Sequence, residues 1–447
     1  MNIKSEFFHL LFVSAILMAS FFIISAQALS PLWISGLAES DQNITDVVDT
    51  GSHFLNYLAI SDGGKTIAAG TYDGNMYLVN ETGAVLWNRT TSSDTRYLHS
   101  LLLSPDGNYL AVSDSGSVPA SNPKKSIRLI HKSGETLWNN PARTFVFYSA
   151  ISSNGSCTVF GSYDDITCFD KTGSSLWTYP VNDRITSLDM SEDGKSTVAV
   201  LDHSSVLCLN MRGEEVWKHE FRDVNDMKMS GDGNYVCLIS SKTLYCLNRE
   251  GTTLWKRALA EDGIMLEVSE TGNTIVVRTP ERAFSYDLSG NKVWEYRSEY
   301  PGSSIHPLSP PLMALSGDGL YTAFISGQSL LLLNQTGISS GNFSSEEPLS
   351  GVAISSDGED VVAITKKDLY FFKNPAYVPD SSVTTNARQN ATGQPLIGEK
   401  VPYQGTESVF SVFYKSALLP YVIGALFLVA TGAAYYLLRW YRRNGAQ

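Results

Sequence analysis

Residues that build metal and redox centres are scarce in this sequence. Its 447 residues include five cysteines, no two of them adjacent, and seven histidines. The histidines are scattered, with no His-Glu-x-x-His motif and no pair at metal-ligand spacing. A phosphate-binding glycine loop and an aspartate-rich loop with calcium spacing are absent as well. We therefore expect no catalytic, cofactor-binding or metal-binding residues, and no enzymatic activity.

Positive charge is also in short supply. The formal net charge is −12, although the C-terminal end of the chain contains Arg439, Arg442 and Arg443. The part of the chain before this basic end is therefore more acidic than the whole. A surface of that sign repels phosphate backbones, so we expect no nucleic-acid partner.

An uncharged apolar run lies close to each end of the chain. The first, residues 7–24, follows Lys4 and leads to Ala26-Gln27-Ala28, whose small alanines suit a signal peptidase. We predict a cleaved signal peptide over residues 1–28 and a mature protein that begins at Leu29. Because the run is long for a signal peptide, an uncleaved membrane anchor remains the alternative.

The second run, residues 417–438, is long enough to cross a bilayer as a helix. A basic tail follows at residues 439–447, and the positive-inside tendency places this tail in the cytoplasm. Residues 375–416 precede the run and are rich in Thr, Ser, Asn, Gly and Pro, which is typical of a flexible stalk. The sequence thus predicts a single-pass protein of the cell membrane, with residues 29–374 outside the cell as a folded ectodomain.

Between these segments the sequence repeats one pattern eight times. Each time, a strand-like apolar run ends in a Ser-x-x-Gly turn, and two further short apolar runs follow. The first six units continue with another glycine and, four residues later, a tryptophan, whereas the seventh keeps Gly337 but lacks the tryptophan. The eight turns are Ser61–Gly64, Ser104–Gly107, Ser152–Gly155, Ser191–Gly194, Ser230–Gly233, Ser269–Gly272, Ser316–Gly319 and Ser355–Gly358.

Each unit is predicted to be a sheet of four short antiparallel strands. Such sheets bury both faces when they stack radially around an axis, so the sequence predicts an all-β, eight-bladed β-propeller. The eighth unit stops after its third strand, residues 369–372, whereas Pro31-Leu32-Trp33-Ile34 has the pattern of a fourth strand without a unit. We expect this N-terminal strand to pair with the eighth blade and close the ring.

The third and fourth strands carry a family pattern. Asp170-x-x-Gly173-x-x-x-Trp177, with a small residue at position 168, resembles the PQQ-like propeller repeat Ala-x-Asp-x-x-Thr-Gly-x-x-x-Trp. The resemblance covers nearly all of residues 31–374. The family includes quinoprotein dehydrogenases as well as assembly scaffolds and surface proteins without a cofactor, so the resemblance leaves the function open. It implies that one tryptophan per blade docks on a neighbouring blade: Trp33, Trp87, Trp138, Trp177, Trp217, Trp255 and Trp294.

The cysteines resemble core residues more than a disulfide framework. Cys168, Cys208 and Cys246 share one position in three successive units, where the PQQ-like repeat has a small alanine. Cys237 stands opposite Cys246 across a predicted hairpin, which makes Cys237–Cys246 the one candidate disulfide. Cys157 is offset by two residues from the equivalent position, so we expect it not to pair with Cys168. Most of the thiols should be free and buried.

One position of the first strand is charged in three successive blades only. Two residues before the turn serine, these blades have Asp189, Lys228 and Glu267, where the other blades have Ala or Leu. The first strand is the innermost of each blade, so these side chains should line the central channel. We interpret them as an ion network, because unpaired charges would be costly there. A ligand-orienting patch is the alternative.

The longer connections fall on one face of the predicted disc. Residues 35–53, 113–125 and 296–311 all join strands at the face opposite the Ser-x-x-Gly turns. Variable loops on a rigid scaffold are where binding sites concentrate. Two sequons outside the repeat, at Asn43 and Asn390, are candidates for glycosylation.

These features predict a membrane-anchored, extracytoplasmic binding or scaffold propeller without catalysis. Its expected partners are proteins or glycans that contact the long connections. A PQQ-dependent oxidoreductase is the alternative that the family resemblance allows. A ligand-sensing subunit of a membrane complex is a second alternative, although the short cytoplasmic tail would leave signalling to another subunit.

Overall fold

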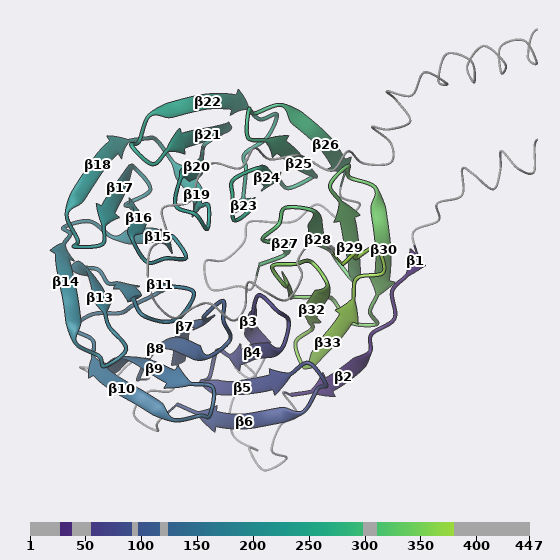
Figure 1. The fold of residues 1–447 in the computed structure, drawn as a ribbon, viewed down its shortest axis with the longest axis horizontal. Helices are drawn as coiled ribbons and strands as arrows, with labels where there is room; N and C mark the ends of the chain where they lie inside the picture. The colour runs from purple at the N-terminus through teal and green to yellow at the C-terminus, as the bar shows by residue number, and fades with distance from the viewer. Residues whose placement is uncertain (1–26, 38–54, 92–96, 117–123, 298–310, 380–447) are drawn as a thin grey trace, which may run out of the picture. The chain divides into compact units, whose positions relative to one another are not determined.

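A computed structural model of the chain describes residues 27–37, 55–91, 97–116, 124–297 and 311–379. All of their regular structure is β-strand, arranged as eight sheets around a central axis (Figure 1). Among the described residues, no helix is long and apolar enough to cross a membrane.

Contacts divide the chain into two units, Met1–Val378 and Pro379–Gln447, and the propeller belongs to the first. The predicted membrane helix, stalk and tail lie outside the described residues apart from the stalk's first few residues. The same holds for residues 1–26 of the predicted signal peptide and for the sequons at Asn43 and Asn390. These predictions therefore stay predictions.

Each of the first six blades is an antiparallel sheet of four consecutive strands. Blade 1 comprises β3 (Leu55–Ile60), β4 (Thr66–Thr71), β5 (Asn75–Asn80) and β6 (Val85–Thr90). Blade 2 comprises β7 (Tyr97–Leu103), β8 (Tyr109–Ser115), β9 (Lys125–His131) and β10 (Thr136–Pro141). Blade 3 comprises β11 (Tyr148–Ile151), β12 (Thr158–Gly161), β13 (Asp165–Phe169) and β14 (Ser175–Pro180).

Blade 4 comprises β15 (Ile185–Met190), β16 (Ser196–Leu201), β17 (Ser205–Asn210) and β18 (Glu215–Glu220). Blade 5 comprises β19 (Val224–Met229), β20 (Tyr235–Ser240), β21 (Thr243–Asn248) and β22 (Thr253–Ala258). Blade 6 comprises β23 (Met265–Val268), β24 (Thr274–Arg278), β25 (Arg282–Asp287) and β26 (Lys292–Arg297).

The last two blades each contain a strand from the N-terminal part of the chain. Blade 7 comprises β27 (Met313–Leu315), β28 (Tyr321–Ser326), β29 (Ser329–Asn334) and β30 (Ser339–Ser344), with β1 (Gln27–Ala28) added outside β30. Blade 8 comprises β31 (Gly351–Ile354), β32 (Asp360–Ile364), β33 (Asp368–Lys373) and, as its outer strand, β2 (Trp33–Gly36).

The ring closes as the sequence predicts. β2 lies beside β33 (Figure 1) and pairs antiparallel with it, and Trp33 is opposite Phe371 in this pairing. The eight-bladed, all-β architecture and the N-terminal closing strand are thus confirmed. The pairing of β1 with β30 was not expected, because Gln27 and Ala28 fall inside the predicted signal peptide.

Apolar side chains pack between neighbouring blades rather than in one centre. Every residue of the middle strands β28 and β32 is buried, since both of their faces contact another blade. One such cluster joins blades 1 and 8 through Ile67, Val79 and Phe371. This arrangement explains why the second run of each repeat is almost continuously apolar.

The Ser-x-x-Gly motif builds the turn between the first and second strands. In blade 2 the buried Ser104 hydroxyl accepts a hydrogen bond from the Tyr109 amide at 3.0 Å and donates to Asp106 at 2.6 Å. The Gly107 amide donates to the Ser104 carbonyl at 2.7 Å, and Gly107 has φ of +72°. Only glycine adopts that conformation without steric cost. The hydrogen bonds of the hydroxyl therefore explain the serine of the motif, and the positive φ explains its glycine.

Each tryptophan of the repeat lies against the next blade. Trp138, for example, covers Gly173, where an added Cβ would lie 2.6 Å from the indole Cγ. The Trp87 indole also donates to the Lys132 carbonyl at 2.9 Å. The seven tryptophans meet seven glycines in turns between third and fourth strands: Gly83, Gly134, Gly173, Gly213, Gly251, Gly290 and Gly337.

The cysteine predictions need correction. Cys237 and Cys246 are directly opposite in β20 and β21, as expected, but both are free and buried. The disulfide joins Cys157 and Cys168 instead, with their Cα atoms 6.2 Å apart. An offset of two residues keeps a side chain on the same face of a strand, so Cys157 is a diagonal neighbour of Cys168. The expectation that these two cysteines cannot pair was therefore wrong.

Candidate functional site: the central channel

The innermost strands leave a central cavity of about 1240 Å³ among the described residues. Its wall comes from the first strand of each blade, β3 round to β31, and from the connections at both ends of these strands. The first strands lie nearest to the axis of the ring (Figure 1). The charge on the described part of this wall is unbalanced, with one lysine, Lys228, against eight carboxyl groups. These are Asp62, Asp189, Glu192, Asp223, Asp226, Asp262, Glu267 and Glu270.

The structure brings together the three charged residues that the sequence singles out. Asp189, Lys228 and Glu267 lie on β15, β19 and β23, the inner strands of three successive blades. The Lys228 Nζ lies 3.8 Å from the Glu267 Oε2. Asp189 binds backbone, because its carboxylate accepts hydrogen bonds from the Met190 amide at 2.9 Å and from the Met229 amide at 2.8 Å. It thereby ties blade 4 to blade 5.

A fourth member of the cluster, Asp226, was missed in the sequence. Its carboxylate accepts from the Met227 amide and from the Leu266 amide of the next blade, both at 2.8 Å. Asp226 thus repeats one blade later the contact that Asp189 makes. The signal was available, because Asp226 lies two residues before Lys228 and therefore on the same face of β19.

The cluster raises the pKa of its carboxyl groups and that of its lysine. Burial raises the pKa of Asp226 to about 6 and that of Glu267 to about 7, although Lys228 opposes both shifts. Burial also raises the pKa of Asp189. The Glu267 carboxylate, more than the two aspartates, raises the pKa of Lys228 above its ordinary value. One lysine therefore compensates three carboxyl groups only in part.

A second acidic group lies at the channel mouth formed by the Ser-x-x-Gly turns. Asp62, Glu192 and Glu270 each occupy the second position of a turn. Burial and repulsion from Glu270 raise the pKa of Asp62 to about 6 and that of Glu192 to about 7. In two other turns this position is glycine, and an added Cβ at Gly231 would lie 2.4 Å from the Glu192 carboxylate.

Backbone hydrogen bonds join neighbouring turns around this mouth. The Asp62 amide donates to the Pro105 carbonyl at 2.9 Å, and the Glu270 amide donates to the Gly317 carbonyl at 2.8 Å. The Ser356 amide donates to the Asp62 carbonyl at 3.1 Å. The acidic side chains are therefore mounted on a rigid ring rather than on loose loops.

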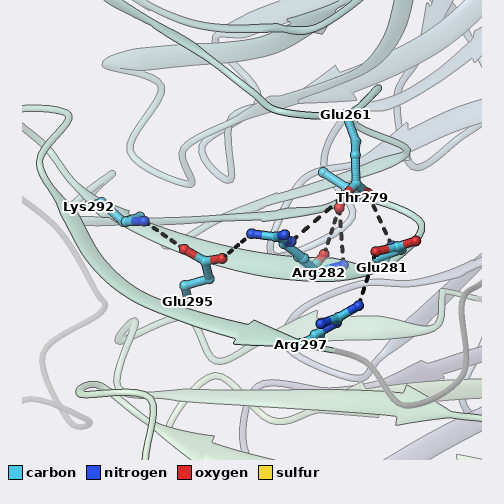
Figure 2. Close-up of polar contacts among 7 residues, drawn as sticks. All are labelled: Glu261, Thr279, Glu281, Arg282, Lys292, Glu295 and Arg297. Atoms are coloured by element: carbon cyan, nitrogen blue, oxygen red, sulfur yellow. Dashed lines mark hydrogen bonds and ion pairs between the residues drawn. The ribbon is translucent and has the colours of Figure 1, made fainter.

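A separate charged network lies on blade 6 (Figure 2). Glu295 pairs with Arg282 at 2.6 Å and with Lys292 at 2.7 Å, and Arg282 also lies 3.7 Å from Glu261. These side chains are about one-third exposed or more, apart from Glu261, and exposed pairs contribute little to stability. Every carboxylate in this network has a cationic or backbone partner. We therefore interpret the network as surface ion pairs that connect neighbouring segments of blade 6.

Other candidates for chemistry are packed core residues. His99 lies on the channel wall, with Nε2 2.6 Å from the Ser115 hydroxyl and its ring edge-on to Phe147. Burial lowers its pKa to about 4, so it is neutral at physiological pH. The stretch Gly337–Gly341 has the spacing of a nucleophile elbow, but it forms a β-hairpin rather than a strand-to-helix turn.

Within the part of the chain that the structure describes, no group of three or more His, Cys, Asp or Glu side chains could hold a metal ion. Most of the three long connections lies outside the described residues. Only their flanks are seen, for example Ser35 in β2, Ser113 in β8 and Tyr296 in β26.

Comparisons with known proteins agree with this architecture. No curated protein sequence matches the chain significantly. The C-terminal WD40 domain of Sif2 has a TM-score of 0.59 at 10% identity, covering 78% of this chain and 99% of that one, which indicates the shared fold alone. The β-propeller domain of Myceliophteria thermophila Cps50 (Swd1) scores 0.47 at 11% identity, covering 74% and 99%, and is too distant to support an argument.

A family model gives the sequence-level match. The PQQ_2 family, described as "Outer membrane protein assembly factor BamB", matches residues 194–370, which span blades 5 to 7 and most of blades 4 and 8. The repeat outside this range has the same turns, glycines and tryptophans. This match and the eight blades of the same repeat support a PQQ-like β-propeller repeat protein.

Proposed function

We propose that this propeller is a binding or scaffold module that is anchored to a membrane, displayed outside the cytoplasm and not catalytic. Its partners are proteins or glycans that contact the face with the long connections, residues 35–53, 113–125 and 296–311. The predicted signal peptide and the membrane helix at residues 417–438 support the location.

The observation that carries the proposal is the difference between the two faces of the disc. Strands β2, β8 and β26 end, and β3, β9 and β27 begin, on the face opposite the Ser-x-x-Gly turns. The connections between them are the longest in the propeller. The turn face, in contrast, repeats one tight hydrogen-bonded turn eight times. Sequence variation concentrated on one face of a rigid scaffold is typical of a binding surface.

A quinone cofactor does not fit the channel, which argues against the oxidoreductase alternative. PQQ is a polycarboxylate at neutral pH, and the described wall that would receive it has eight acidic side chains against one cation, Lys228. Asp189 and Asp226 also direct their oxygens to backbone amides of the next blade rather than into the cavity. We therefore derive no redox step. Added PQQ and calcium should produce no bound chromophore, and a stoichiometric visible band would contradict this.

The location can be tested on intact cells. A protease added outside should release fragments of the propeller, while a tag placed after Gln447 stays protected. Release of the C-terminal tag instead would reverse the topology.

The binding face can be tested with the detergent-solubilised full chain. Replacing residues 38–54 by a short Gly/Ser linker should abolish crosslinking to the partner. A matched change on the turn face, with exposed Lys195 and Asn234 both replaced by Ala, should leave crosslinking intact. If only the turn-face variant loses the crosslink, the partner binds the face with the Ser-x-x-Gly turns, and the proposed binding face is wrong.

A further inference from the structure

Blade 7 differs from the others because its neighbour lacks a turn. Each repeat tryptophan covers a glycine in the turn between the third and fourth strands of the next blade. Blade 8 has no such turn, since its third and fourth strands, β33 and β2, come from opposite ends of the propeller sequence. A tryptophan on blade 7 would have no glycine to cover. The corresponding position, four residues after Gly337, is Gly341.

Leu29 occupies the space beside Gly341. An added Cβ at Gly341 would lie 2.8 Å from the Leu29 Cγ. Leu29 is only 7% exposed and belongs to the apolar cluster between blades 7 and 8, with Leu332 and Phe372. The side chain that completes blade 7 therefore comes from the N-terminal segment and not from the repeat.

The backbone of this segment is held as well. β1 lies along β30 (Figure 1). Gln27 pairs in parallel with Gly341 and Ala28 with Asn342, and the Leu29 nitrogen donates to the Asn342 carbonyl at 2.6 Å. Among the described residues, β30 is the only outer strand of a blade that has a further strand on its outside. Cleavage after Ala28 would remove the two paired residues of β1, so the contacts that a processed chain retains are the Leu29 side chain beside Gly341 and the Leu29 nitrogen at the Asn342 carbonyl.

The bond predicted to be cut by signal peptidase joins Ala28 to Leu29. Hydrolysis adds one water, so Ala28 leaves with a carboxylate and Leu29 gains an α-amino group, protonated at neutral pH. We propose that the outer edge of blade 7 is a binding pocket for this processed N-terminus. The Leu29 ammonium donates to the Asn342 carbonyl, and the leucine side chain fills the space that tryptophan fills in other blades.

Two physical effects favour this state. A charged donor makes a stronger hydrogen bond than the amide that it replaces. The short link from Leu29 to Trp33 is also held at both of its ends, by Leu29 on blade 7 and by Trp33, which pairs with and stacks on Phe371 of blade 8. The pocket therefore couples processing of the chain to closure of the ring. This inference rests on the export part of the proposed function.

The test measures the reactivity of the N-terminal amine in the full chain purified from an exporting host. Intact mass first establishes the start residue. An acylating reagent near pH 7 then modifies the α-amine in preference to lysines, because its ordinary pKa is about 8 against about 10.4. In native protein we expect the Leu29 amine to react at least about tenfold more slowly than in denaturant.

Variants separate the pocket from general folding. Leu29→Ala and Gly341→Trp should each restore most of the denatured-state rate, because one removes the anchor and the other fills its space. Leu32→Ala is the matched control on the same segment, since Leu32 is 62% exposed, and it should leave the slow rate unchanged. Far-UV circular dichroism and thermal melts of each variant verify that the fold persists.

Three outcomes would overturn the proposal. A chain that begins at any residue other than Leu29 has no free N-terminus in the pocket, and an uncut chain would also refute the export prediction. A chain cut at Leu29 whose native amine reacts as fast as in denaturant refutes the pocket alone. Equal acceleration by Leu29→Ala and Leu32→Ala would mean that the protection is not specific to the pocket.

Discussion

The indole of Trp33 stacks on the ring of Phe371, with centroids 5.2 Å apart and planes inclined by 6°. These residues come from the first and last described strands of the eighth blade, β2 and β33. The Trp33 indole also donates to the Glu81 carbonyl of blade 1 at 2.9 Å. One side chain near the N-terminus therefore contacts both blades that meet at the closure.

Deleting residues 29–35 should destabilise the propeller well beyond the effect expected of a short terminal truncation. It removes the outer strand of blade 8, exposes the edge of β33 and uncovers Gly83 of blade 1. We expect a melting temperature lower by several degrees, although about 1 kcal/mol corresponds to only roughly 1–2 °C in a propeller of this size, because the entropy of unfolding grows with chain length. A truncated protein that melts within about one degree of wild type would disprove the closure.

Two glycine-to-alanine changes test the docking of blades. Gly173→Ala should cost about 2 kcal/mol or more, because φ of +83° is strained for alanine and the new methyl collides with Trp138. Gly63→Ala should change stability by less than about 1 kcal/mol, since nothing lies within 4 Å of its added Cβ. Urea unfolding midpoints measure both. Equal effects would mean that the repeat glycines do not fix blade packing.

The thiols should react as the corrected pairing requires. Intact mass should show one disulfide, and peptide mapping should assign it to Cys157 and Cys168. Cys208, Cys237 and Cys246 should be alkylated slowly in native protein and rapidly in denaturant, because all three are buried and burial raises the pKa of Cys208 to about 12. A Cys237–Cys246 disulfide in the map would contradict the structure.

The sequence predicts those parts of the fold that depend on repeated local chemistry. The motif of Ser104 and Gly107 predicts a turn, and the residues around Trp33 predict a fourth strand that belongs to no N-terminal unit. Both predictions succeed because each residue has a fixed geometric role. Leu29 and β1 could not be predicted in the same way. Their parallel addition to β30 uses backbone hydrogen bonds, which any sequence can make, and two residues show no periodicity.

The candidate site was predicted only in part for a different reason. Asp189, Lys228 and Glu267 were found by comparing one position between blades, and that comparison cannot reveal Asp226 at another position of the same strand. The pairing of Cys157 with Cys168 does not follow from directly opposite positions, because Cys168 is opposite Val159 and Cys157 lies two residues before Val159. In both cases the relevant neighbour lies two residues away on the same face, which the period of a strand allows.

Channel carboxyls should make stability fall as the pH rises. Burial raises the pKa of Asp226 and Glu267 from 3.8 and 4.5 to about 6 and about 7. Such groups bind protons more tightly in the folded state, so their contribution is full below the unfolded values and is lost as the pH rises through about 6–7. We expect the melting temperature to fall between about pH 4 and pH 7 and to change little above pH 7.

Variants identify which groups cause this slope. Asp226→Asn combined with Glu267→Gln should flatten it, whereas Asp170→Asn on an exposed turn should not, because a hydrogen bond from Thr172 lowers the pKa of Asp170. A melting temperature that rises through this range would show that the buried carboxyls do not dominate.

Lys228 provides the last test, because it separates a structural from a ligand-binding role of the channel cluster. Lys228→Met leaves the Glu267 carboxylate without its cation and should cost about 1–3 kcal/mol. This is less than the roughly 3–5 kcal/mol of a fully buried pair, since the Lys228 side chain is 38% exposed. Adding Glu267→Gln to Lys228→Met should recover part of the loss, because no stranded charge remains beside the methionine. A ligand-orienting role predicts the opposite pattern, in which Lys228→Met barely changes the free energy of unfolding and the double variant folds normally but loses its partner. Urea unfolding of the two variants distinguishes these roles, and a single variant as stable as wild type would rule out the ion network as a structural element.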